Sequence, residues 1–229
     1  MKKIVLVLAS ILMANICLFA QQSLEPDELS SHGLVLVGRF GASDDLTFKD
    51  RSVRVLELKE RQDLAIGYTN DMGGNINLKY LRIEGPDWAA FEEKMAIVNE
   101  KFAKWTQTAK TDGVTNFKKT IPVDFENIVG KWSIGFTDGY WETKLYAVFE
   151  VDSAGGCTLR LDDWEEYDSR SSSYESQMHS PFFVFESPES FNVLYELIKV
   201  ENVKKNYDQI KAKINAKLQA ENDRDAKFD

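Results

Sequence analysis

The change from strand to helix is clearest at residues 80–105, which read YLRIEGPDWAAFEEKMAIVNEKFAKW. After the proline, bulky residues recur at alternating steps of three and four, which places them on one face of a helix. They are Trp88, Phe91, Met95, Val98, Phe102 and Trp105. Gly85 suits the N-cap, and proline is tolerated at the first helical position because its missing N–H would have no partner there. We therefore expect a strand ending at Glu84 and a helix from Pro86 to Lys110.

The same signature recurs in the second half of the chain. Residues 182–189, FFVFESPE, end a strand-like run in Glu, a small residue, Pro and an acid, as residues 80–87 do. A second match links residues 37–40, VGRF, with residues 129–132, VGKW. Each pair of matches brackets four strand-like segments separated by turn-forming residues. We interpret the chain as two pseudo-repeated β4-α units, with chance similarity of two short motifs as the alternative.

The expected strands fall into two groups of four. They are 34–40, 52–59, 64–69 and 75–84 in the first half and 130–136, 142–151, 157–162 and 181–186 in the second. Apolar and polar residues alternate along 141–152, a pattern typical of an antiparallel strand with one buried face. The predicted fold class is α+β, with antiparallel sheets covered by helices and a long C-terminal helix that breaks near Glu201-Asn202.

The organisation follows from these elements. A first β4-α half spans 34–110, a connector spans 111–127, a second β4-α half spans 128–222, and a polar tail spans 223–229. Each half alone would leave an apolar face uncovered, and packing the halves together buries both. One domain is therefore favoured over two independent ones.

Residues 1–20 have the composition of a secretory signal peptide. Lys2 and Lys3 precede a mainly apolar run at residues 4–13, and Ala20 is a small residue at the expected cleavage point. The run is about half the ~20 residues that a bilayer span needs, which favours a cleaved leader over an anchor. We predict an exported protein, periplasmic or extracellular, with an N-terminal linker at 21–33 and no membrane span after cleavage.

A lipid anchor is the alternative for this leader. A lipoprotein signal needs small residues directly before its cysteine, and Asn15 and Ile16 precede Cys17. The non-lipidated form is therefore favoured. Removal of the leader leaves Cys157 as the only thiol, so no intramolecular disulfide can form. The apolar residues around Cys157 predict a buried, unreactive thiol.

The charge of the chain argues against one class of partner. Twenty-eight basic and thirty-seven acidic residues give a net charge of −9, and loss of Lys2 and Lys3 changes −9 to −11. Binding of nucleic acid depends on a basic surface, so no nucleic acid partner is predicted. The sequence contains no zinc helix, phosphate loop, dinucleotide fingerprint or nucleophile elbow. We therefore assign no catalytic residue, metal ligand or cofactor.

The candidate binding residues are aromatic residues and one histidine in two predicted loops. In the long irregular stretch 164–180 they are Trp164, Tyr167, Tyr174 and His179, and beside a turn predicted at 137–139 they are Tyr140 and Trp141. Exposed aromatic rings would stack on a glycan or a peptide, and the alternative is that they only close neighbouring strands. The acidic group at 162–168 lacks the turn that folds carboxylates around calcium, so it predicts a solvated loop.

These observations favour a non-enzymatic binding protein whose partner is a protein, a glycan or a small ligand. The oligomeric state stays open. A secreted glycan hydrolase is one alternative, because such enzymes need only two carboxylates at a suitable spacing. A second alternative comes from Gly130-Lys131-Trp132, which resembles the Gly-x-Trp opening of lipocalin barrels and implies a carrier of a small apolar ligand. Lipocalins have eight consecutive strands, whereas the helix from Pro86 interrupts the strands here, so we do not assign that family.

Overall fold

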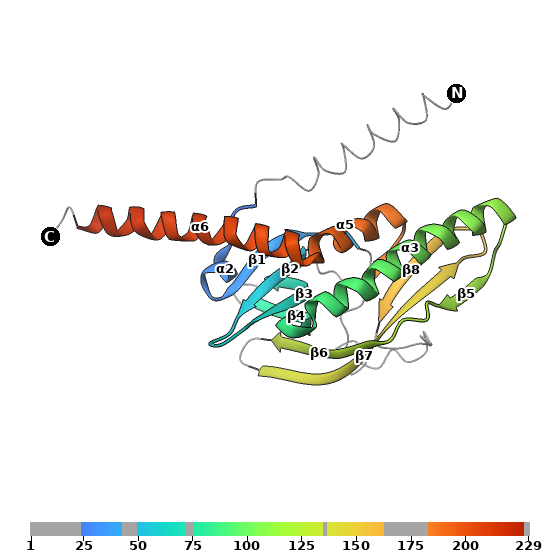
Figure 1. The fold of residues 1–229 in the computed structure, drawn as a ribbon, viewed down its shortest axis with the longest axis horizontal. Coiled ribbons are helices and arrows are strands. Elements are labelled where there is room, and N and C mark those ends of the chain that lie inside the picture. The colour runs from blue at the N-terminus through green and yellow to red at the C-terminus, as the bar shows by residue number, and fades with distance from the viewer. Residues whose placement is uncertain (1–23, 43–49, 72–75, 135–136, 163–182, 227–229) are drawn as a thin grey trace, which may run out of the picture.

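The computed structural model describes residues 24–42, 50–71, 76–134, 137–162 and 183–226. The expected α+β class is confirmed, with antiparallel strands, covering helices and a long helix at the C-terminus (Figure 1). The strands are β1 (Leu34–Arg39), β2 (Asp50–Glu57), β3 (Gln62–Asp71), β4 (Ile76–Ile83), β5 (Phe117–Thr120), β6 (Phe125–Ile134), β7 (Thr137–Val151), β8 (Cys157–Asp162) and β9 (Phe183–Phe185). The helices are α2 (Glu28–Ser31), the 3₁₀ turn η1 (Gly85–Asp87), α3 (Trp88–Asp112), α5 (Pro188–Ile198) and α6 (Val200–Asp225).

All of the described strands pair antiparallel, and all except β5 form one continuous order. The order is β1-β2-β3-β4-β6-β7-β8-β9, and β5 pairs with β7 outside this path. The long strand β7 joins two regions, because its residues 137–145 pair with β6 and its residues 146–151 pair with β8. The ring of Phe40, directly after β1, lies 5.4 Å from the ring of Phe183 in β9. The two ends of the strand order therefore approach each other.

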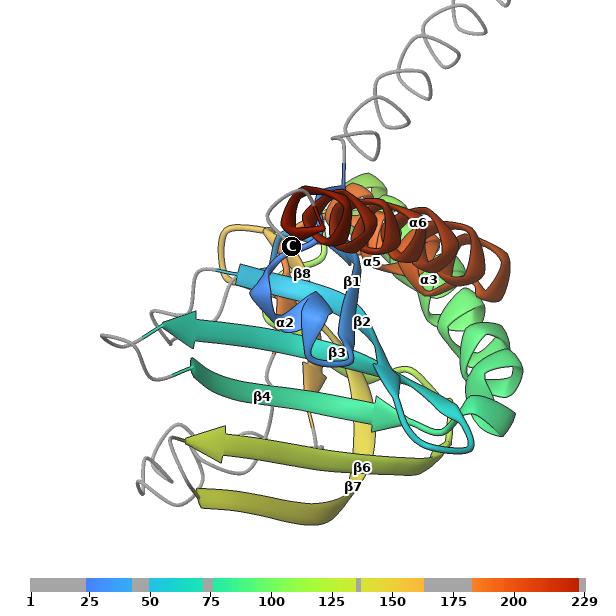
Figure 2. The ribbon, with the colours of Figure 1, turned by 90° about the vertical axis from the view of Figure 1, so that its left-hand side faces the viewer.

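The helices cover one side of this sheet and share one hydrophobic core with it. Figure 2 shows α3, α5 and α6 gathered on one side of the strands. The core contains residues of both predicted halves, among them Val53 from β2, Phe102 from α3 and Phe191 from α5. The apolar stripe predicted for α3 is confirmed from Trp88 to Phe102, all of whose members are buried. A single core of this kind is what binds the elements of a domain together.

Both prolines begin helices, but their entries differ. Ser187 is the N-cap of α5, with Pro188 in the first turn and a reciprocal capping box with Ser190. In the other entry, Gly85 and Pro86 form the turn η1 before α3, and the N-cap of α3 makes no side-chain hydrogen bond. Gly85 lies so close to β3 that a Cβ atom on it would stand 2.5 Å from the backbone oxygen of Gln62.

The C-terminal helix breaks two residues before the expected position. Lys199 has an extended ψ of 129° and separates α5 from α6. A carboxylate oxygen of Glu92 in α3 accepts the N–H of Val200 at 2.9 Å, which satisfies one of the free donors at the new helix start. At the other end α6 continues to Asp225, beyond the predicted start of the polar tail, and its last turns extend past the sheet (Figure 1).

Two further differences concern the second half. The hairpin between β6 and β7 pairs Ile134 with Thr137, so Asp138 and Gly139 lie in the strand and the turn falls earlier than predicted. The predicted connector contains β5, whose short, lysine-containing sequence has no clear alternation.

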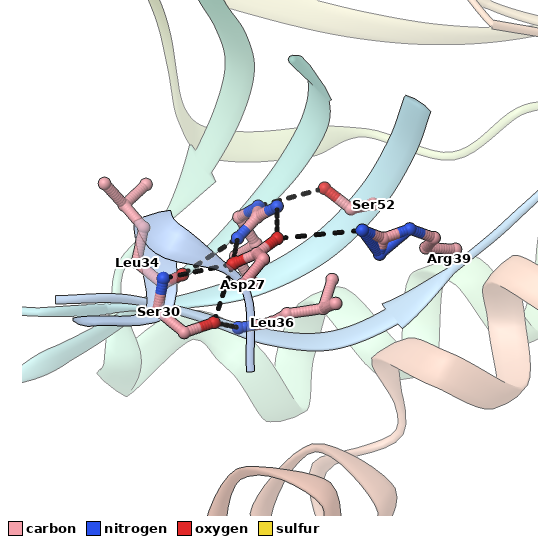
Figure 3. A network of polar contacts seen from close by, with 7 residues as sticks. Asp27, Ser30, Leu34, Leu36, Arg39 and Ser52 are labelled. Atoms are coloured by element: carbon pink, nitrogen blue, oxygen red, sulfur yellow. Dashed lines mark hydrogen bonds and ion pairs between the residues drawn. The ribbon is translucent and has the colours of Figure 1, made fainter. Parts of the chain in front are cut away.

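The N-terminal segment, expected as a linker, is attached to the sheet by a cluster of polar residues (Figure 3). The buried guanidinium of Arg54 donates to both carboxylate oxygens of Asp27, at 3.0 and 2.6 Å. Asp27 also caps α2 by accepting from the N–H of Ser30, and Arg54 donates to Ser52 at 3.1 Å. We call these four residues, Asp27, Ser30, Ser52 and Arg54, the Arg54 cluster.

Among the residues that the structure describes, no helix is long and apolar enough to cross a membrane.

Candidate functional site

A groove of about 300 Å³ opens between α6 and the start of α3. Its lining comes from β2, β3, α3 and α6 and consists of Val55, Gln62, Trp88, Val203, Lys204, Tyr207 and Asp208. The volume lies at the lower end of the range typical of small-molecule pockets. The groove therefore has room for a small ligand.

The floor of the groove is apolar and fixed in place. Val55 and Val203 are almost fully buried, and the indole of Trp88 is 7% exposed. The indole Nε1 donates to the backbone oxygen of Ile83 at 3.1 Å, which fixes the ring orientation. Because Trp88 is the first residue of α3, the turn at Gly85–Asp87 decides where this ring stands.

Gln62 is positioned by the buried carboxylate of Asp63. Asp63 is fully buried, and its oxygens accept from the backbone N–H of Gly85 at 3.1 Å and from Nε of Arg82 at 2.6 Å. Arg61 adds an ion pair at 3.2 Å. These contacts fix the start of β3 against the turn before α3, and so they set the width of the groove at Gln62.

The helix α6 supplies the polar side of the groove. Tyr207 and Asp208 follow Lys204 by three and four positions, so each of them neighbours Lys204 on the helix surface. The amide of Asn206 donates to the backbone oxygen of Val37 at 2.9 Å and attaches α6 to β1. Lys204 and Asp208 are exposed at the rim, and each can approach a polar group of a ligand.

The hydroxyl of Tyr207 donates to the carboxylate of Glu57 at the end of β2, and Lys211 Nζ lies 3.0 Å from the same carboxylate. We call Glu57, Gln62, Tyr207 and Lys211 the Glu57 cluster. Burial alone would raise the pKa of Glu57, but the hydrogen bond from Tyr207 and the ammonium of Lys211 outweigh it and lower that pKa. Burial, with the hydrogen bond to the charged Glu57 carboxylate, raises the pKa of Tyr207 to about 12. At neutral pH Glu57 is therefore ionised and Tyr207 keeps its proton.

Of the six binding residues predicted from the sequence, the structure describes two. Tyr140 and Trp141 belong to β7, where they pair with Lys131 and Gly130 of β6. Trp164, Tyr167, Tyr174 and His179 lie outside the described residues. Neither Tyr140 nor Trp141 is among the residues that line the groove.

Cys157 is a buried free thiol, as expected. Burial raises its pKa, and the charge of Lys110 opposes this effect only in part. A thiol whose pKa is raised is a poor nucleophile at neutral pH.

The acidic group at 162–168 was predicted to be a solvated loop, and the structure describes only its first residue, Asp162. Asp162 is buried instead, and its carboxylate accepts from Nη1 of Arg160 at 2.5 Å.

The groove residues were missed because they come from distant parts of the chain. Trp88 fits the helix stripe and reads as core, while Tyr207 and Lys204 read as part of an ordinary helix surface. Glu57 and Tyr207 are 150 positions apart, and no local pattern links them. Within the described residues, no group of three or more His, Cys, Asp or Glu side chains could hold a metal ion.

Comparisons with protein-family models, with curated proteins and with solved structures found no match.

Proposed function

We propose that this chain is an exported, non-enzymatic binding protein that takes a small amphipathic ligand into the groove between α6 and α3. The observation that carries the proposal is the composition of the groove. An apolar floor at Trp88, Val55 and Val203 faces a polar side at Lys204, Tyr207 and Asp208. Binding sites for small molecules combine an apolar lining with a few polar groups in this way.

Binding is favoured over catalysis by the protonation states of Tyr207, which lines the groove, and of its partner Glu57. General acids and bases work best when their pKa lies near the operating pH. The pKa of Glu57 is lowered and that of Tyr207 is raised to about 12, so both are shifted away from neutrality. A carboxylate and a phenol in these states hold each other in place and leave Gln62, Lys204 and Asp208 to contact a ligand.

A glycan hydrolase has less support among the described carboxylates. Asp63 and Glu84 converge on Arg61 and Arg82. Glu150 and Asp162 converge in the same way on Arg160. Hydrolysis of a glycoside needs two carboxyl groups that face the substrate across an open space, whereas these carboxylates are held in ion pairs with arginines.

A carrier of an apolar molecule has less support from the packing between sheet and helices. That space is filled by large side chains that are fully buried, namely Phe102, Phe149, Phe183, Phe185 and Phe191. Their rings contact one another, as Phe185 and Phe191 do at 5.1 Å. A ligand in this place would have to displace part of the core.

Two further proposals rest on the sequence. The leader at 1–20 exports the chain, and the mature protein recovered from the periplasm or medium would begin at Gln21.

The second proposal is that the two β4-α units descend from one duplicated unit. In the first unit Gly38 has a specific packing role, since a Cβ atom there would stand 2.2 Å from Leu197 of α5. The internal duplication would lose its support if sequences related to this chain did not keep both VG motifs.

The proposed binding site is tested by a substitution that places a bulky side chain at the rim of the groove. Lys204→Trp places a large ring at the rim, whereas Lys205→Trp, one position along the same exposed helix, makes the same change outside the lining. A set of small sugars, amino acids and carboxylic acids is screened by thermal shift against the mature protein. A ligand at about a hundred times its Kd stabilises the folded state by about 2.7 kcal/mol, which is easily measured.

We expect at least one ligand to raise the melting temperature of the wild type and of Lys205→Trp but not of Lys204→Trp. Two results would contradict the proposal. One is a screen without any shift, and the other is a ligand whose shift survives in Lys204→Trp.

A further inference from the structure

A second surface lies at the other end of α3, away from the groove. It combines side chains from α3 and from the edge strand β5, which lies near the C-terminal half of that helix (Figure 1). We call it the basic face, and its residues are Ile97, Lys101, Lys104, Trp105, Phe117 and Lys119. Ile97, Lys101 and Lys104 are spaced by four and three residues, so they share one side of the helix.

Aromatic contacts hold the two elements of the basic face together. The rings of Trp105 and Phe117 pack on Phe149 of β7, with centroids at 5.7 and 6.4 Å. The ammonium groups of Lys101 and Lys119 lie 5.7 and 5.2 Å from the centre of the Trp105 ring. The half-buried indole of Trp105 therefore contacts one lysine from α3 and one from β5.

The charge of this region differs from that of the whole chain. Residues 101–120 contain five lysines and one aspartate, although the complete chain has a net charge of −9. Lys118 pairs with Glu150 on the other side of β5, at 3.2 Å. Lys101, Lys104 and Lys119 make no ion pair with any residue that the structure describes. Three lysines without an ion-pair partner among the described residues thus lie together on an acidic protein, with the exposed Glu100 as their acidic neighbour on α3.

The basic face is also apolar at its surface. Ile97 is 43% exposed and Phe117 is 41% exposed, and both are among the large hydrophobic residues most exposed in the described chain. Lysines beside exposed apolar and aromatic side chains are typical of surfaces that lie in the headgroup region of a membrane. There the rings enter the boundary of the acyl chains while the ammonium groups remain at the phosphates.

We propose that the basic face docks the protein on a bilayer that contains anionic phospholipid. The uneven distribution of charge supports an anionic bilayer over an uncharged surface. Anionic lipid repels the acidic remainder of the chain, and this repulsion orients the basic face towards the bilayer. The contact is peripheral and reversible. It is independent of the groove, which lies at the opposite end of α3.

The test measures co-sedimentation of the mature protein with vesicles. Vesicles of an equimolar mixture of phosphatidylglycerol and phosphatidylcholine are compared with vesicles of pure phosphatidylcholine. Each lysine at such a surface contributes roughly fivefold in affinity, so Lys101→Glu/Lys119→Glu should weaken binding at least about thirtyfold. Phe117→Ser should weaken it roughly fivefold and keep that effect at about 0.5 M salt, where charge is screened.

The matched control is Lys205→Glu/Lys217→Glu, which makes the same change of net charge on exposed positions of α6. Lys101→Gln/Lys119→Gln serves in place of the reversal if the reversal does not fold. The proposal holds if anionic vesicles bind the wild type and the control but not the basic-face variant. It is overturned if anionic vesicles do not bind the wild type, if the control loses as much binding, or if soluble dextran sulfate binds and vesicles do not.

Discussion

The Arg54 cluster, in the middle of strand β2, and the Glu57 cluster, at its end, use similar groups, yet the cations of the two clusters differ in access to water. In the Arg54 cluster the arginine side chain is 5% exposed, and backbone, hydroxyl and carboxylate groups surround it. In the Glu57 cluster the carboxylate and Lys211 are each about a third exposed, at 28% and 32%. Asp27 and Glu57 are almost equally exposed, at 27% and 28%, so the same strand carries one ion pair with a buried cation and one with a partly exposed cation beside the groove.

The difference teaches where charge stabilises the fold and where it is available for binding. A buried guanidinium without a carboxylate is very unfavourable, so the Arg54 cluster holds the N-terminal segment on the sheet. A partly exposed pair contributes little to stability because water competes for both partners. The Glu57 cluster therefore fixes the side chain of Tyr207 beside the groove but contributes little to the stability of the fold.

The largest effect should come from Asp27→Ala. The substitution leaves Arg54 buried without a carboxylate and removes the cap of α2, so we expect a loss of about 3 kcal/mol in the free energy of unfolding. Urea denaturation followed by circular dichroism measures it. Asp27→Ala/Arg54→Met should recover part of the loss, because the buried charge is removed as well.

The control is Asp124→Ala. Asp124 pairs with Lys144 at 3.6 Å, but both side chains are more than half exposed. An exposed pair of this kind typically contributes less than about 1 kcal/mol. If Asp27→Ala and Asp124→Ala cost the same, the distinction between enclosed and open clusters is wrong.

Much of the fold was predictable because local patterns decide it. The apolar stripe of α3, the proline entries, the four strands of the first half and β8 were placed within a few residues. Gly113, with a positive φ of 64°, ends α3 two residues after the predicted end at Lys110. Apolar periodicity, turn residues and helix caps depend on residues that are close in the sequence, so they can be recognised without knowledge of the tertiary contacts.

The groove and the strand order depended on contacts that no local pattern contains. The break before α6 falls at Lys199 because Glu92, 108 positions earlier, accepts the N–H of Val200. The pairing of β4 with β6 skips β5, a four-residue strand at the edge of β7. The residues that line the groove meet only after α6 has packed across β1, so the sequence alone pointed to aromatic residues in loops instead.

A smaller effect should follow from Tyr207→Phe. The change removes one hydrogen bond to a charged carboxylate but keeps the ring, and Lys211 still neutralises Glu57. We expect a loss of about 1 kcal/mol in the free energy of unfolding, well below that of Asp27→Ala. Tyr146→Phe is the control, since its hydroxyl makes no hydrogen bond within the described residues and its ring contact with Lys144 remains. A loss as large as that of Asp27→Ala would mean that the Glu57 cluster is also a structural core.

The smallest effect is a dependence on alkaline pH that belongs to the open cluster alone. The pKa of Tyr207 rises from 10.0 to about 12 in the folded protein, so between these values the unfolded chain has lost a proton that the folded chain keeps. Stability from this group is therefore complete below pH 10 and falls as pH rises towards 12. We expect the difference in unfolding free energy between wild type and Tyr207→Phe to shrink over that range, while the difference between wild type and Asp27→Ala stays constant. Parallel urea titrations at pH 9 and at higher pH measure both differences. If the Tyr207→Phe difference did not change with pH, the hydrogen bond to Glu57 would not control the proton of Tyr207, and the groove would lack the fixed polar side on which its ligand depends.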